Sequence, residues 1–264
     1  MLELIKELCA IPGVSGREDA VREYIIGKIE GHAEYHVDAL GNLIVFKKGK
    51  KPANHKVMLD AHMDEVGFII TGITPEGFLR FTKVGGIDTR VALGRAVKVG
   101  EHGISGVLGV KPIHLLDKKE EADMPKDDDL YIDIGARNRE EAKTMVMVGD
   151  TAAFSGALSG NGNRVMGPYL DNRAGCAVLL ETMQQTQHPT NDLYYVFTTQ
   201  EEVGMRGAKP AAWAVDPEYA LAVDVTCPDD QPGALHEATT KLGGGAAIKI
   251  MDHSVLCHRE VVAR

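Results

Sequence analysis

KVMLDAHMDEVG, residues 56–67, is the stretch that decides the fold. Its first part, Lys56–Ala61, is a short apolar run of the kind that forms a buried strand, and this run ends directly at His62. Two further apolar runs follow much later in the chain, at 193–199 and 220–225. Because helical patterns alternate with these runs, the sequence predicts a mixed or parallel sheet that is covered by helices on both faces.

The rest of this predicted α/β framework lies on either side of the quoted stretch. Near the N-terminus, Ser15-x-x-Glu18 has the pattern of a capping box, and apolar residues at helical spacing then predict a helix that runs to about Gly31. Two short strands are expected at 34–37 and 42–46, and further helices at 171–185 and 207–215.

Residues 67–160 have a different pattern of predicted secondary structure. Short β patterns recur between glycine-containing turns, and helical periodicity almost vanishes. Closely spaced strands of this kind predict a small β-barrel or sandwich, with the charge-dense segment 116–129 as a surface loop. We therefore expect an α/β domain formed by residues 1–66 and 161–264, interrupted by an inserted β domain at 67–160. The six strands expected in the insert are 68–71, 78–82, 96–99, 106–110, 130–134 and 151–155.

The amino-acid composition argues against several classes of protein. The formal net charge of −9 argues against a nucleic-acid or anionic-membrane binder, because such proteins gain affinity from clustered lysine and arginine. No apolar run approaches the roughly 20 residues of a membrane span, and the acidic, amphipathic start does not resemble a signal peptide. Four widely spaced cysteines without a CxxC pair indicate buried free thiols rather than disulfides. We therefore expect a cytoplasmic protein. Its 44% hydrophobic residues are enough to form a hydrophobic core.

Polar residues at the predicted strand ends are the candidates for a functional site. Ligands at the carboxyl ends of neighbouring strands are typical of sites in open α/β sheets. Taken singly, each residue also has an ordinary structural explanation: a satisfied buried histidine, a helix N-terminal carboxylate, a turn carboxylate or solvated glutamates. Taken together they favour a cation site, because a buried strand that ends in two carboxylates is unfavourable unless a cation is bound. The candidates are His62, Asp64, Asp171, Glu201, Glu202 and Asp224.

Four motifs in a fixed order make the sequence similar to a known family: AHMDEVGF at 61–68, GPYLDNRAG at 167–175, QEEVGMRGA at 200–208 and VDVT at 223–226. From Met1 to about Ser254 the chain resembles the TET-type dinuclear aminopeptidases of metallopeptidase clan MH, family forty-two. The resemblance implies a mixed-sheet sandwich of the clan MH type, interrupted by a PDZ-like barrel that mediates dimerisation. The long separation of His62 from Asp171 leaves room for this insert.

The resemblance also implies two divalent metal ions, zinc or cobalt, and a role for each candidate residue. The general base would be Glu201, and Asp64 would orient the imidazole of His62. The metal ligands would be His62 and Asp224 on the first ion, Glu202 on the second, and Asp171 bridging both.

Peptides would be the substrates, and dimers of the chain would assemble into a tetrahedral dodecamer.

A further histidine of the family pattern has no counterpart before the chain ends at Arg264, and neither His253 nor His258 is assigned to that role. Two alternatives stay open at this point. One is a catalytically impaired assembly module, and the other is a glycoside hydrolase with two acidic residues, although the single tryptophan offers little sugar stacking.

Overall fold

A computed structural model describes residues 1–50, 55–117, 123–233, 239–252 and 254–263. The chain divides into two compact units, Met1–Asp224 and Val225–Arg264. The first unit contains a five-stranded mixed sheet and a closed six-stranded barrel. The prediction of an α/β fold with a β-barrel is confirmed.

The mixed sheet has the order β1-β2-β12-β3-β13. Strand β2 is antiparallel to both of its neighbours, whereas β12 and β13 both run parallel to the central strand β3. The five strands are β1 (Glu34–Val37), β2 (Leu43–Lys47), β3 (Lys56–His62), β12 (Asp192–Thr198) and β13 (Tyr219–Ala222).

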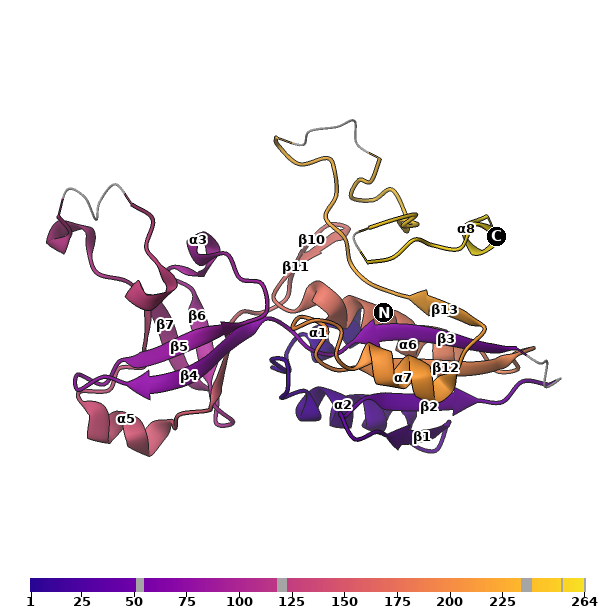
Figure 1. Ribbon diagram of the computed structural model, residues 1–264, viewed down its shortest axis with the longest axis horizontal. Coiled ribbons are helices and arrows are strands. Elements are labelled where there is room, and N and C mark those ends of the chain that lie inside the picture. The colour runs from indigo at the N-terminus through magenta and orange to yellow at the C-terminus, as the bar shows by residue number, and fades with distance from the viewer. Residues whose placement is uncertain (51–54, 118–122, 234–238, 253, 264) are drawn as a thin grey trace. The chain divides into compact units, whose positions relative to one another are not determined.

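Helices cover both faces of this sheet (Figure 1). On one face Leu43, Val45 and Phe197 pack against helices α1 (Leu2–Leu8), α2 (Asp19–Ile29) and α6 (Leu170–Gln185). On the other face the intervening residues Ile44 and Val196 pack against α7 (Ala208–Val215). The two cores follow from the alternation of side chains along each strand, so consecutive apolar residues in β2 and β12 are buried on opposite faces.

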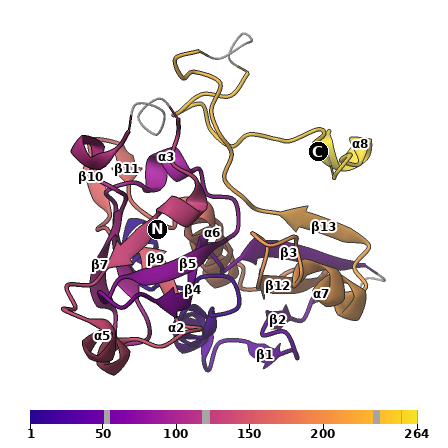
Figure 2. The same ribbon diagram turned by 60° about the vertical axis from the view of Figure 1, so that its left-hand side comes forward.

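The barrel closes in the order β4-β5-β8-β7-β6-β9. Strands β4, β5, β7 and β9 of this barrel are labelled in Figure 2. Its interior is filled by side chains from every strand, including the fully buried Phe68, Leu79 and Ile132, and by Ala142 of a covering helix. All six strands were expected from the sequence, with bounds that differ by a few residues. They are β4 (Gly67–Ile73), β5 (Leu79–Val84), β6 (Ala96–Val99), β7 (Ile104–Gly109), β8 (Tyr131–Asp133) and β9 (Thr151–Phe154).

Several short elements were not expected. Asn138 caps the N-terminus of α5 (Arg139–Met145) by accepting a hydrogen bond from the Glu141 amide, so a helix forms where strand patterns dominate. The predicted loop 116–129 ends in a 3₁₀ turn, and its residues 118–122 lie outside the described residues. The additional elements are α3 (Thr89–Ala92), η1 (Ile113–Leu115), η2 (Asp127–Asp129), α5 (Arg139–Met145), β10 (Ser159–Asn161), β11 (Arg164–Met166) and, in the second unit, α8 (Arg259–Val262).

The predicted capping box at the start of α2 is wrong. The helix begins at Asp19 with Glu18 as its N-cap residue, and no side chain caps it. The Ser15 hydroxyl instead donates to Asp64, and the Glu18 carboxylate accepts from the amides of Gly16 and Gln200. Ser15 and Glu18 are therefore both bonded to segments far away in the sequence.

Among the described helices, none combines the length and the hydrophobicity that a crossing of a lipid bilayer requires.

Candidate metal centre

The three parallel strands of the sheet end at one edge. In the parallel ladder Thr198 at the end of β12 lies beside His62 at the end of β3, and β13 leads directly to Asp224. The carboxyl ends of parallel strands are where open α/β sheets place their ligands. The fold thus brings residues from three separate parts of the sequence to one location.

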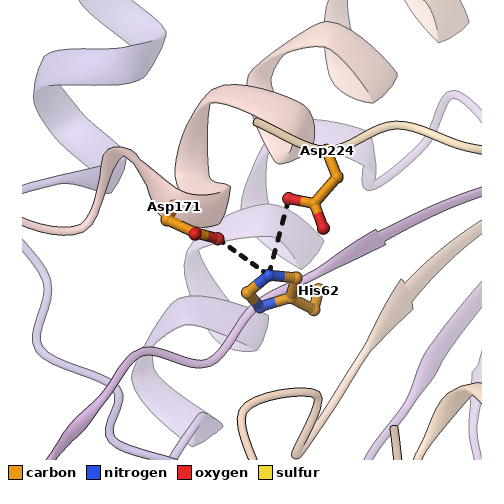
Figure 3. A group of neighbouring side chains, drawn as sticks. All are labelled: His62, Asp171 and Asp224. Atoms are coloured by element: carbon orange, nitrogen blue, oxygen red, sulfur yellow. Dashed lines mark hydrogen bonds and ion pairs between the residues drawn. The ribbon is translucent and has the colours of Figure 1, made fainter. Parts of the chain in front are cut away.

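His62, Asp171 and Asp224 form a cluster at this edge (Figure 3). Both carboxylates point toward Nε2 of His62, which lies 3.0 Å from Oδ1 of Asp171 and 3.7 Å from Oδ1 of Asp224. The three donor atoms lie within 4.8 Å of one another. His62 is 3% exposed, whereas both aspartates are exposed, so the cluster opens to solvent on the carboxylate side.

The other ring nitrogen of His62 contacts Asp64. Nδ1 lies 3.1 Å from the backbone oxygen of Asp64 and 3.3 Å from its Oδ1 atom. Burial lowers the pKa of His62, but the hydrogen bonds to Asp171 and Asp64 outweigh burial and raise this pKa to about 11. The ring therefore lies in a strongly negative environment that favours a cation beside Nε2.

Asp64 also organises the loop that carries the two glutamates. Its carboxylate is fully buried and accepts hydrogen bonds from the backbone amides of Glu201 and Glu202, at 2.9 and 3.1 Å. A third bond comes from the Ser15 hydroxyl at 2.6 Å. A single carboxylate thus fixes the histidine and the glutamate loop relative to each other.

Both glutamates are half-buried and have raised pKa values. Burial is the main cause of the raised pKa of Glu201, and Asp224, Asp64 and Asp171 add to it although His62 opposes them. Burial and the nearby Asp171 raise the pKa of Glu202 to about 7. The two glutamates, whose pKa values are raised by burial and by neighbouring carboxylates, belong to a site that a bound cation would stabilise.

The donor set fits a divalent metal ion. One imidazole nitrogen and carboxylate oxygens, with the imidazole's other nitrogen held by a carboxylate, are the ligands and the supporting contact that zinc sites use. A further sign of excess negative charge is Asp60, two residues before His62 on β3. Its Oδ1 atom is buried without a hydrogen-bond partner among the described residues. His62, Asp171 and Asp224 could hold one ion, and Asp171 and Glu202 a second.

Three buried polar residues at this edge were not recognised from the sequence as parts of the site. Asn42 and Glu18 accept hydrogen bonds from the amides of Thr199 and Gln200, which directly precede Glu201. Arg173, two residues after Asp171, is fully buried. The pattern that begins at Ser15 and ends at Glu18 was a visible signal, but it was interpreted as a helix cap.

Two histidines, His253 and His258, were left without a role on the basis of the sequence. His253 lies outside the described residues, and His258 belongs to the second unit.

Comparisons with known proteins identify the same family as the motifs. The family model described as M42 glutamyl aminopeptidase matches residues 41–264. An aminopeptidase-family protein of Acetivibrio thermocellus is 46% identical over 262 residues, which make up 99% of this chain and 76% of that protein. The chain therefore spans about three quarters of this relative's length.

Solved structures similar to this chain include aminopeptidases, as the relatives found by sequence do. An aminopeptidase from the archaeon Desulfurococcus kamchatkensis superimposes with a TM-score of 0.92 at 38% identity, covering 99% of this chain and 74% of that one. The TET1 peptidase of Pyrococcus horikoshii, described as able to assemble into a tetrahedron or a large octahedral shell, gives a TM-score of 0.87 at 40% identity, covering 99% and 78%. These matches to aminopeptidases do not favour the glycoside hydrolase alternative.

Proposed function

This chain belongs to the M42 glutamyl aminopeptidase family of hydrolases, and we propose that it removes N-terminal residues from peptides with two divalent metal ions and Glu201 as the general base. The observation that carries this proposal is the cluster of His62, Asp171 and Asp224 at the sheet edge, beside the loop of Glu201 and Glu202. Zinc or cobalt suits a set of imidazole and carboxylate donors.

The ligands divide between two ions in this proposal. His62 and Asp224 would hold the first, Glu202 would hold the second, and Asp171 would be shared by both. Ions bound there would supply Lewis acidity, which polarises the scissile carbonyl and makes the attacking water more acidic. Asp64 holds Nδ1 of His62 and thereby leaves Nε2 directed at the ligand carboxylates.

Glu201 moves the proton. One of its carboxylate oxygens accepts a proton from the attacking water and then gives it to the nitrogen of the leaving amine. A raised pKa suits this role, because a base works best when its pKa lies near the operating pH. The free ammonium of the substrate is attracted by the excess of carboxylates around the site, which favours an aminopeptidase over an endopeptidase.

The barrel serves assembly in this proposal. Residues 67–160 form a PDZ-like dimerisation domain, and residues 1–66 and 161–264 form the catalytic domain. The TET1 peptidase of Pyrococcus horikoshii can assemble into a tetrahedron or a large octahedral shell, and we propose that dimers of this chain form a tetrahedral dodecamer. Active sites inside such a shell would admit unfolded peptides only.

The test is hydrolysis of a panel of aminoacyl p-nitroanilides before and after treatment with a strong chelator. We expect turnover of substrates with a free amine, no turnover of the N-acetylated forms, loss of activity in the chelator and recovery with added zinc or cobalt. Activity that survives complete metal removal would refute the proposed mechanism.

A further inference from the structure

The loop that carries Glu201 and Glu202 is attached to the rest of the protein through its backbone amides. Four consecutive amides, those of residues 199–202, each donate to a side-chain oxygen from an earlier part of the chain. The acceptors are Asn42 for Thr199, Glu18 for Gln200, and Asp64 for both glutamates. All three acceptors are buried, at 0%, 4% and 0% exposure in that order.

The Glu18 carboxylate makes a contact that a helix cap does not need. One oxygen, Oε1, accepts from the Gly16 amide at 2.7 Å and from the Gln200 amide at 3.1 Å. Although Glu18 is the N-cap residue of α2, its side chain makes no capping bond to that helix. The carboxylate therefore joins the segment before α2 to the residue directly before Glu201.

Gln200 needs such a partner. Its φ of 56° lies in the left-handed region, which residues other than glycine adopt only when their surroundings hold them there. This conformation turns the chain at the end of β12, so it determines where Glu201 and Glu202 lie. An amide that is withdrawn from water is unfavourable without an acceptor, so the bond from the half-buried Gln200 to Glu18 favours this conformation.

Resting on the proposed roles of the two glutamates, we propose that Glu18 is a positioning residue for peptide hydrolysis: through the Gln200 amide it holds Glu201 and Glu202 at the metal site. Asn42 supports the same loop from its other side. Its amide group accepts from Thr199 and donates to the backbone oxygen of Gly207, which closes the loop at both ends.

The test compares three variants. Glu18→Ala removes the acceptor, Glu18→Gln keeps a carbonyl oxygen that can accept both bonds, and Glu23→Ala removes an exposed glutamate from the same helix as a control. The readouts are kcat and KM, the affinity for zinc measured by competition with a chromogenic chelator, and hydrogen exchange of the amides in residues 199–202.

We expect Glu18→Ala to lower kcat by about tenfold to a hundredfold with little change in KM, the range for losing a hydrogen bond to a charged group or misplacing a catalytic group. Zinc bound through Glu202 should be held more weakly, and the amides of 199–202 should exchange faster. Glu18→Gln should restore most of kcat and of the exchange protection, and Glu23→Ala should behave as the unmodified protein does.

An unchanged kcat, zinc affinity and exchange in a folded Glu18→Ala protein would overturn the proposal. So would a loss of thermal stability without these three effects, since Glu18 would then be only structural. If Glu18→Ala does not fold, Glu18→Asp decides by the same criteria, because it keeps the charge but is too short to reach the Gln200 amide. Absence of metal-dependent hydrolysis in the unmodified protein would refute the proposed function, whereas exchange and zinc affinity would still test Glu18.

Discussion

At the scale of single residues, His62 combines two contacts that its sequence position alone does not specify. Nδ1 faces Asp64 two residues later, and Nε2 faces Asp171 and Asp224 from two distant segments. Because the imidazole ring is buried, it cannot rotate to exchange the partners of Nδ1 and Nε2 without displacing the side chains packed around it. The imidazole is therefore preorganised for a ligand at Nε2.

The first prediction concerns Glu201. We expect Glu201→Gln to retain metal but to lower kcat by about two to four orders of magnitude, the scale of general-base assistance, because the amide cannot accept the proton. The measurement is kcat together with metal content per subunit. Glu202→Gln is the matched control, for which we expect loss of metal as well as of activity. Unchanged kcat in Glu201→Gln would exclude Glu201 as the base.

A second prediction concerns the two ions. In the proposed site, the cluster of His62, Asp171 and Asp224 would give the first ion one nitrogen and two oxygen donors. Asp171 and Glu202 would give the second ion oxygen donors only. Carboxylates and water hold zinc or cobalt less tightly than a set that includes imidazole. We expect dialysis to leave close to one ion per subunit, and added zinc or cobalt to recover activity. Metal analysis that finds two tightly retained ions would contradict this assignment.

At the scale of elements, Arg173 connects three segments beneath the site. Its guanidinium donates to the backbone oxygens of Leu8, Ile11 and Met63 and forms an ion pair with Glu65 at 2.6 Å. The Glu65 carboxylate in turn accepts from a backbone amide in the turn after α1. The end of α1, this turn and the end of β3 are thus held together by one buried cation on α6.

The third prediction follows from this burial. Arg173→Met should reduce the free energy of unfolding by about 3–5 kcal/mol, because it leaves the Glu65 carboxylate buried without its partner. The measurement is urea denaturation. The exposed Arg95→Met is the control and should change stability by no more than about 0.5 kcal/mol. The double variant Arg173→Met/Glu65→Leu should recover part of the loss, and failure to recover any would contradict the ion-pair explanation.

At the scale of the whole molecule, the chain combines a closed barrel with an open sheet. Closure removes the free edges of the barrel, whereas β1 and β13 remain the edges of the five-stranded sheet. The barrel strands β4–β9 lie between His62 and Asp171 in the sequence, and none of their described residues belongs to the cluster. The insert can therefore serve assembly without altering the donor set.

The fourth prediction concerns that assembly. We expect light scattering at micromolar concentration to give a mass well above the 28.5 kDa monomer, in multiples of a dimer and up to twelve chains. The size limit on substrates is a second measurement, since a closed shell should cleave short peptides but not a folded protein with a free N-terminus. A monomer that cleaves both equally well would refute the shell.

The sequence by itself determined the class of fold and the order along the chain of the strands in the sheet and the barrel, and it named six candidate residues for the site. It could do so because apolar runs and turn residues act locally, and because His62 and Asp224 each lie at or just after such a run. Three of the six candidates, His62, Asp171 and Asp224, do meet in space. Their roles as ligands, and those of Glu201, Glu202 and Asp64, stay predictions.

Only the tertiary structure decided which polar groups are partners. Ser15 and Glu18 have a local pattern that favours a helix cap, yet both side chains bond to residues that β3 and β12 bring close. Arg173, in the helix predicted at 171–185, donates hydrogen bonds to three distant carbonyl oxygens and pairs with a carboxylate. The physical reason is that a buried donor or acceptor must be satisfied by whatever the packed fold places beside it, and that neighbour is set by the pairing of strands far apart in the sequence.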